Sequence, residues 1–308
     1  MKKLFFLFVL FSVLLTVITA CTSDDTSTLP QSSGDIPEND ITLSGEGTSS
    51  SEDPAESGQK PEDTQAPGTE APVISLSFSK PGGMDSYAVT GIGNLTDTHI
   101  EIPATYNGLP VTQIAEKAFY QNTHITSLTL PDSVTSIGAS AFDGCTALKT
   151  LNLGAVKELG AYAFARCGAL ETVVLPESTN TVGDGLFFSC SSLKSVTLPR
   201  GIQKIGSFFF SYCKNLSSVN SGDCNALQSI DMHAFYNCTS LKYIVIPASV
   251  TSIHDGAFEG CTWLSSVYLD RAKTSSLGNG WYDKSKTHLY WKGEWQYDSD
   301  GVPHVSGT

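Results

Sequence analysis

The sequence predicts a β-rich solenoid in which short coils stack on one another. The first sign is a phenylalanine that returns at intervals of 23, 22, 23, 23, 25 and 23 residues. The second is a set of apolar positions that keeps the same spacing around each phenylalanine. One such unit cannot bury its own apolar face, so units must stack and align equivalent side chains as ladders. The predicted core ladder consists of Phe119, Phe142, Phe164, Phe187, Phe210, Phe235 and Phe258.

The second repeat shows how each coil is built. Leu148, Leu151 and Leu153 follow the pattern L-x-x-L-x-L, which predicts one short strand per coil, and stacked strands form a parallel sheet. Val134 and Ile137 predict a second short extended segment, and residues 141–144 predict a tight helical turn beneath the phenylalanine. The repeat positions are Pro131, Val134, Ile137, Gly138, Ala141, Phe142, Cys145, Leu148, Leu151 and Leu153.

Residues 131–153 and 247–269 resemble the BspA-like branch of leucine-rich-repeat proteins, whose units read LPxSVTSIGxxAFxGCxxLxxVxL. The resemblance covers residues 102–269 as seven repeats of about 23 residues. It implies an α/β leucine-rich-repeat right-handed superhelix with its parallel strands on the concave face, and a binding role on a cell surface. The third unit lacks its proline. The irregular residues 220–225 predict a bulge or loop that carries Cys224.

Cysteine follows the same repeat. Eight cysteines would suggest disulfides if the protein were exported, but six of them occupy one position of successive coils. Such a position predicts a buried ladder of small thiols. Rungs about 4.8 Å apart leave disulfide bonding open, although the Asn122 of the first coil favours free thiols. The ladder consists of Cys145, Cys167, Cys190, Cys213, Cys238 and Cys261.

The first residues have the layout of an export signal. Lys2 and Lys3 precede an apolar run over residues 4–17, and Cys21 follows a small residue. Cys21 resembles the acylated cysteine of bacterial lipoproteins, which implies a signal peptide over residues 1–20. It also implies a protein anchored by lipid to the cell membrane and facing the exterior. An ordinary cleaved signal and an uncleaved anchor are the alternatives.

Residues 21–72 predict a disordered acidic tether. They are rich in Ser, Thr and Pro and nearly free of large apolar side chains, so they cannot offset the entropy of ordering. Residues 22–72 carry a net charge of −11 and residues 73–308 only −4. An acidic motif with its own partner is the alternative for the tether. The near-neutral remainder has no basic stripe, which argues against nucleic-acid binding.

The two flanks of the repeats predict caps. Residues 73–101 contain short strand patterns that would cover the first coil. Residues 270–308 are rich in tryptophan and tyrosine and would cover the last coil, because terminal coils must present a wetted outer face. The alternative for Trp281, Trp295 and their aromatic neighbours is the stacking of sugars.

No pattern of reacting groups recurs along the chain. The histidines have no HExxH spacing, and neither a GxSxG elbow nor a phosphate-binding glycine loop is present. The residues from Asp298 to Gly301 resemble the start of a calcium loop but lack its closing glutamate, so they predict a plain turn. We therefore expect a protein without catalytic residues, metal or cofactor.

The remaining candidate site is the outward face of the strands, where hydroxyl side chains predominate. Solenoids use such extended faces for recognition, and aromatic residues at one end serve as anchors. We expect adhesion to, or interaction with, an extracellular or host protein. Glycan binding through the C-terminal aromatic residues, or service as an accessory component of a surface enzyme system, are the alternatives. The candidate partner-binding residues are Tyr243, Tyr268, Thr150, Asn152, Thr172, Thr197 and Asn220.

Overall fold

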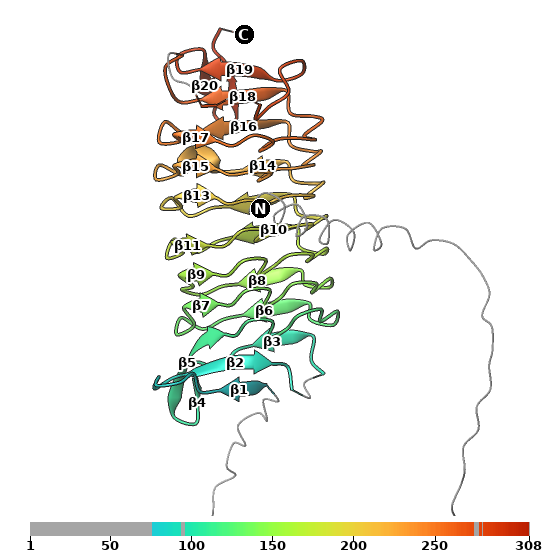
Figure 1. Ribbon diagram of the computed structural model, residues 1–308, viewed down its shortest axis with the longest axis vertical. Helices are drawn as coiled ribbons and strands as arrows, with labels where there is room; N and C mark the ends of the chain where they lie inside the picture. Colours follow the sequence, from blue (N-terminus) through green and yellow to red (C-terminus); the bar gives the residue numbers. More distant parts are fainter. Residues whose placement is uncertain (1–75, 94–95, 274–276, 279, 308) are drawn as a thin grey trace, which may run out of the picture. The chain divides into compact units, whose positions relative to one another are not determined.

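A computed structural model describes residues 76–93, 96–273, 277–278 and 280–307. All of them belong to one compact unit, Gly68–Thr308. The expected signal peptide (1–20), Cys21 and the expected tether (21–72) lie outside the described residues. This unit is a stack of coils with strands on two sides (Figure 1). Within the described ranges, no helix is long and apolar enough to cross a membrane.

The first side of each coil is a short strand, and neighbouring strands run parallel in register. Ile100, Leu128 and Leu151 form one such row of partners. The outward surface of these strands is called the strand face below. The strands are β3 (His99–Glu101), β6 (Ser127–Thr129), β8 (Thr150–Asn152), β10 (Thr172–Val174), β12 (Ser195–Thr197), β14 (Ser218–Val219), β16 (Tyr243–Ile246), β18 (Ser266–Leu269) and β19 (His288–Trp291).

The second side carries shorter strands that also pair in parallel. Apart from β2 (Tyr87–Gly91), which belongs to the predicted N-terminal cap, they come from the segment equivalent to Val134 and Ile137, as the repeat predicts. The strands are β2, β5 (Leu109–Ile114), β7 (Ser136–Ile137), β9 (Glu158–Leu159), β11 (Thr181–Val182), β13 (Lys204–Ile205), β15 (Ser229–Ile230) and β17 (Ser252–Ile253). Two antiparallel strands, β1 (Ser77–Ser79) and β4 (Thr105–Tyr106), flank β2 and β5.

Breaks in the two ladders are staggered along the stack. The first side divides between β8 and β10 and again between β14 and β16, whereas the second divides between β11 and β13. At each of these boundaries the opposite side stays paired, through β7–β9, β13–β15 and β12–β14 respectively. Every pair of neighbouring repeats is therefore joined by at least one strand ladder.

The third side, called the turn side below, differs from the sequence-based expectation. The helical turn predicted over residues 141–144 is not formed. Ser140 has a φ of 52° and Gly144 a φ of 81°, and a left-handed residue at each end prevents helical geometry from continuing. The N–H of Phe142 instead donates to the carbonyl of Ala163 in the next coil, at 2.8 Å. Among the described residues, the one helical element is the 3₁₀ turn η1 (Ser221–Asp223), within the irregular residues 220–225.

The phenylalanines form one continuous column through the core. Successive ring centroids lie 4.9, 5.4, 6.0, 5.9, 5.2 and 5.0 Å apart from Phe119 to Phe258. Each of the seven side chains is at most 3% exposed. Aligned windings thus bury their largest side chains against one another, which is the packing that a single repeat lacks.

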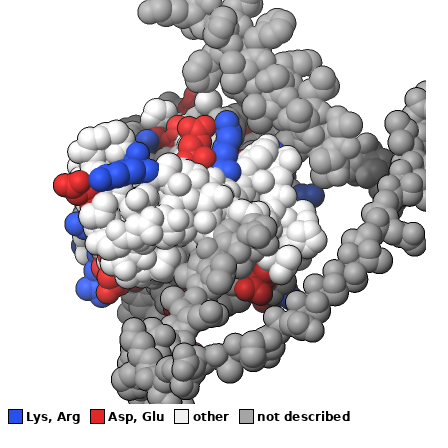
Figure 2. All heavy atoms as spheres, turned by 90° about the horizontal axis from the view of Figure 1, so that it is seen from below, with Lys and Arg blue, Asp and Glu red and all other residues white. Residues whose placement is uncertain are grey.

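The ends of the solenoid hold the residues predicted as caps. Residues 73–75 lie outside the described part, and residues 76–101 contain β1, β2 and β3. At the other end, β19 continues the strand ladder, and β20 (Trp295–Tyr297) and β21 (Pro303–Val305) form an antiparallel hairpin. Figure 2 views the unit from the end that carries β1, where charges of both signs are scattered over a mainly uncharged surface.

Candidate binding face

The middle of the strand face presents an uncharged, solvent-exposed surface. Thr150, Asn152, Thr172 and Thr197 are all exposed, and they lie on the neighbouring strands β8, β10 and β12. Val174 lies among them and is 68% exposed. We call these five residues the central patch. It offers hydroxyl and amide groups for hydrogen bonds around one apolar side chain.

Charged residues border the central patch along the edge where the strands begin. Lys149, Glu171 and Lys194 each precede the first residue of a strand. The Lys194 Nζ lies 2.7 Å from the Glu171 Oε2, and this hydrogen bond lowers the pKa of the Glu171 carboxyl. Both side chains are more than half exposed, so the pair adds little stability. The ion pair places two charged side chains along one border of the uncharged central patch.

Asn220, a predicted partner-binding residue, is engaged by the fold itself. Its Nδ2 donates to the Leu198 carbonyl at 3.1 Å, and its Oδ1 accepts from the Leu198 N–H at 2.7 Å. In regular coils the backbone of the next strand accepts such a hydrogen bond, as Thr197 does from Leu175 at 2.9 Å. The side-chain amide replaces that backbone where η1 leaves the ladder.

Aromatic side chains cover the C-terminal end of the strand face. Tyr268, a predicted anchor, is only 7% exposed, because its ring packs against Tyr290 at 5.2 Å and Trp295 at 5.5 Å. The indole N–H of Trp295 donates to the Leu269 carbonyl at 3.2 Å. Tyr243 is half-buried and meets Tyr268 edge-on at 6.2 Å. The C-terminal hairpin therefore occupies this end, and Tyr268 offers little surface to a partner.

Two tryptophans of the alternative glycan site pack against the fold. Trp281 is 2% exposed and meets Phe258 edge-on at 5.9 Å, so it caps the phenylalanine column. Trp295 is half-buried over Tyr268. Both indoles are held by packing, and Trp281 has no exposed face on which a sugar could stack.

The thiol ladder has a regular geometry of its own. Each Sγ donates to the carbonyl of the phenylalanine one coil earlier, at 3.0 to 3.2 Å. Burial raises the pKa of Cys145 and Cys190 to about 12. The seven described cysteines are all free thiols. High pKa values and backbone partners make these groups structural and unreactive.

The recurring coils correspond to a known family of repeats. The sequence pattern described as "BspA type Leucine rich repeat region" matches residues 112–227 and 224–289, in six copies. The chain belongs to this family. The matched residues include those that form both strand ladders, the turn side and the thiol ladder. No curated protein sequence matches the chain.

Several solved leucine-rich-repeat structures resemble this member of the BspA-type family. A leucine rich repeat protein of T. pallidum is 26% identical, with a TM-score of 0.46, over 63% of this chain and 90% of that one. A leucine-rich repeat protein from Bacteroides ovatus is 23% identical, with a TM-score of 0.47, over 73% of this chain and 72% of that one. A leucine rich cell surface protein from Faecalibacterium prausnitzii is 22% identical, with a TM-score of 0.37, over 71% and 93%.

Val174 is the member of the central patch that the candidate list from the sequence left out. Its repeat position predicts that it faces outward, as it does. Its apolar character, between the polar Asn152 and Thr197 of the two neighbouring coils, was the available signal. An isolated exposed valine on a strand is common, so the signal gains weight only from the exposed neighbours around it.

Proposed function

We propose that this chain is an exported, surface-anchored binding protein that holds an extracellular or host protein on its strand face. Membership of a repeat family supports a binding role, because solenoids present extended surfaces rather than closed catalytic pockets. The proposed anchor is Cys21, and residues 21–72 would carry the repeats away from the membrane.

The observation that carries this proposal is the exposed central patch. Five neighbouring outward side chains are uncharged, and the exposed apolar surface of Val174 lies in their midst. Water is released from such a surface at little electrostatic cost, while the hydroxyls form directional hydrogen bonds to a partner. The charged rim of Lys149, Glu171 and Lys194 would orient that partner.

The test compares two pairs of outward substitutions in the full chain displayed on cells. Thr172→Arg with Thr197→Arg alters the central patch. Thr181→Arg with Gln203→Arg alters exposed positions of the second side and serves as the matched control. Capture of extracellular matrix and host surface proteins should fall at least about tenfold for the first pair only, a change of roughly 1.4 kcal/mol. Equal capture by both pairs would refute the strand face as the binding surface.

The anchor is tested separately. A Cys21→Ala variant removes the proposed site of acylation, so the protein should move from the membrane fraction to the medium or the soluble fraction. Several acyl chains hold a protein durably, because each buried methylene contributes about 0.8 kcal/mol. Cell fractionation of the variant and the unaltered chain measures this. Full retention of the variant would refute a lipid anchor at Cys21.

A further inference from the structure

The turn side is joined from coil to coil by hydrogen bonds that repeat at equivalent positions. At the position two residues after each core phenylalanine, the backbone N–H donates to a carbonyl of the next coil. Gln121, Gly144 and Arg166 begin this series, with distances of 2.7, 2.8 and 2.7 Å. Ser189, Tyr212 and Asn237 continue it at 2.7, 2.7 and 2.8 Å. The phenylalanine carbonyl accepts the thiol of the next coil.

This series ends after Phe258. The next segment begins as a further coil, because the Trp281 carbonyl accepts from the Phe258 N–H at 3.2 Å. The chain then turns back on itself, and the Asp283 carbonyl accepts from the N–H groups of Lys286 and Thr287 at 3.2 and 2.9 Å. That carbonyl is therefore used within its own turn, and no cysteine follows at the ladder position.

Two backbone groups are left without their usual partners in consequence. Among the described residues, no carbonyl accepts from the N–H of Gly260, and no thiol or hydroxyl donates to the carbonyl of Phe258. Each earlier coil satisfies both groups. The Gly260 N–H and the Phe258 carbonyl are thus a donor and an acceptor at the open end of the turn side. One further turn, built like those of the earlier coils, would pair with both.

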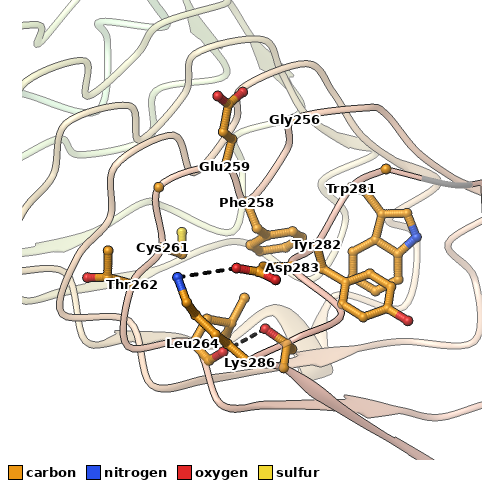
Figure 3. Close-up of a pocket in the computed structure, with 13 residues that line it drawn as sticks. Gly256, Phe258, Glu259, Cys261, Thr262, Leu264, Trp281, Tyr282, Asp283 and Lys286 are labelled. Atoms are coloured by element: carbon orange, nitrogen blue, oxygen red, sulfur yellow. Dashed lines mark hydrogen bonds and ion pairs between the residues drawn. The ribbon is translucent and has the colours of Figure 1, made fainter.

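A pocket lies at this position (Figure 3). It has a volume of about 300 Å³, and Thr262, Tyr282 and the ion pair of Asp283 with Lys286 are among its lining residues. The Asp283 Oδ2 and the Lys286 Nζ are 3.3 Å apart. Cys261, which also lines the pocket, is the one ladder thiol that is not fully buried. The volume is at the small end of the usual range for ligand sites.

We propose that this pocket binds a short peptide segment that adopts the turn of the missing rung. Such a segment would supply a carbonyl to the Gly260 N–H and a thiol or hydroxyl to the Phe258 carbonyl, as each coil does for the one before it. Main-chain groups would give the affinity, as in the addition of a peptide strand to a sheet edge. The Phe258 ring is covered by Trp281, so the segment would begin after the phenylalanine position.

The probe is the tetrapeptide with the sequence of residues 143–146, with acetyl and amide ends, kept under reducing conditions. It holds the turn residues that would follow the phenylalanine. The full chain is titrated with this peptide, with the reversed sequence and with N-acetylglucosamine, and the amide signal of Gly260 is followed by NMR. We expect a saturable shift with the first peptide alone.

A pocket-filling substitution locates the effect. Thr262→Trp places a large ring at the pocket, and Thr146→Trp places the same ring at the equivalent exposed position of an interior coil. The dissociation constant should rise at least about tenfold in the first variant and stay unchanged in the second. No saturable shift, an equal shift with the reversed peptide, binding unaffected by Thr262→Trp, or binding of the sugar alone would overturn the proposal. None of these results bears on the strand face.

Discussion

The choice of cysteine at one position of six coils has a local explanation. A thiol is small enough for the space beneath the turn, and at Phe142 it donates to the second lone pair of a carbonyl that already accepts the Cys145 N–H. The first coil has no preceding phenylalanine. Its Asn122 instead accepts from the N–H groups of His124 and Ile125, at 2.9 and 3.0 Å. The exception in the sequence therefore follows from the absence of an earlier rung.

The contribution of one thiol is measurable against a matched cysteine outside the ladder. Cys190 and Cys224 are both 0% exposed, but their Sγ atoms lie 3.1 and 3.6 Å from the nearest carbonyl partners. Cys190→Ala should destabilise the protein more than Cys224→Ala, by about 0.5–1 kcal/mol for the lost S–H hydrogen bond. Urea unfolding of both variants gives the difference. Equal losses would mean that the ladder contact adds nothing beyond burial.

Thiol reactivity is a second test at this scale. Burial raises the pKa of Cys145, Cys190 and Cys224 to about 12, so the reactive thiolate is scarce below that pH. At pH 8 about one thiol in ten thousand is ionised. Iodoacetamide followed by peptide mapping should leave these residues unmodified in the native protein and modify them in urea. Rapid modification of Cys190 without denaturant would contradict the buried ladder.

The repeat predicts which positions lie in the core, but it does not predict the contacts that each side chain makes. The repeat alone places Phe142 and Cys145 inside. It does not reveal that Asn220 binds the backbone of Leu198, because that depends on where the chain leaves the ladder. Nor does it reveal the burial of Tyr268, which depends on a hairpin that begins at Trp295.

At the scale of the element, close approach of the coils sets the corners that follow β7, β9 and β11. A Cβ on Gly183 would lie 2.3 Å from the Ala161 nitrogen, and one on Gly160 would lie 2.4 Å from the Ala139 nitrogen. Backbone atoms cannot yield as a flexible side chain can. The coil beneath therefore requires glycine at these corners, whereas Asp231 and His254 stand at the equivalent positions after β15 and β17.

Gly183→Ala should destabilise the protein by about 1–3 kcal/mol, as expected when atoms are forced into a packed region. Gly201→Ala is the control, because a Cβ there meets nothing within 4 Å. Its effect should stay within about 0.5 kcal/mol. Thermal unfolding followed by circular dichroism measures both. Similar melting temperatures for the two variants would show that the coils are not this close.

The third side of the coil was the element that the sequence could not predict. Residues 141–144 read as a helical turn because left-handed geometry at non-glycine positions has no strong local signal. Ser140, Tyr162 and Phe208 nevertheless have φ values of 52°, 57° and 58°. These values position N–H groups toward the next coil, so neighbouring windings and not local propensity decide the geometry.

The whole unit depends on contacts between neighbouring coils, so its ends decide how well the stack is closed. Because the breaks are staggered, at least one strand ladder joins every pair of neighbouring repeats. The second side therefore stays paired beside the irregular residues 220–225. Stability in such arrays is close to a sum of coil and interface contributions. Loss of an end contact should therefore loosen the nearest coils first.

Trp295→Ala tests the closure of the C-terminal end. The indole covers Tyr268 and donates to Leu269, so its loss should destabilise the unit by about 1–3 kcal/mol. Hydrogen exchange should quicken in β18 and β19 before it does in β8. Trp263→Ala, at an indole that is 66% exposed, is the control and should have little effect on either. Unchanged exchange in β18 would show that the hairpin does not close the stack.

The central claim is that equivalent side chains of successive coils form one column. Nuclear Overhauser effects between selectively labelled phenylalanine rings test this most directly. Phe142 and Phe164 have ring centroids 5.4 Å apart, and Phe164 and Phe187 have theirs 6.0 Å apart. Cross-peaks should join each of these pairs, and none should join Phe142 to Phe187. Absence of both neighbouring cross-peaks, or a direct cross-peak between Phe142 and Phe187, would contradict the stacked solenoid.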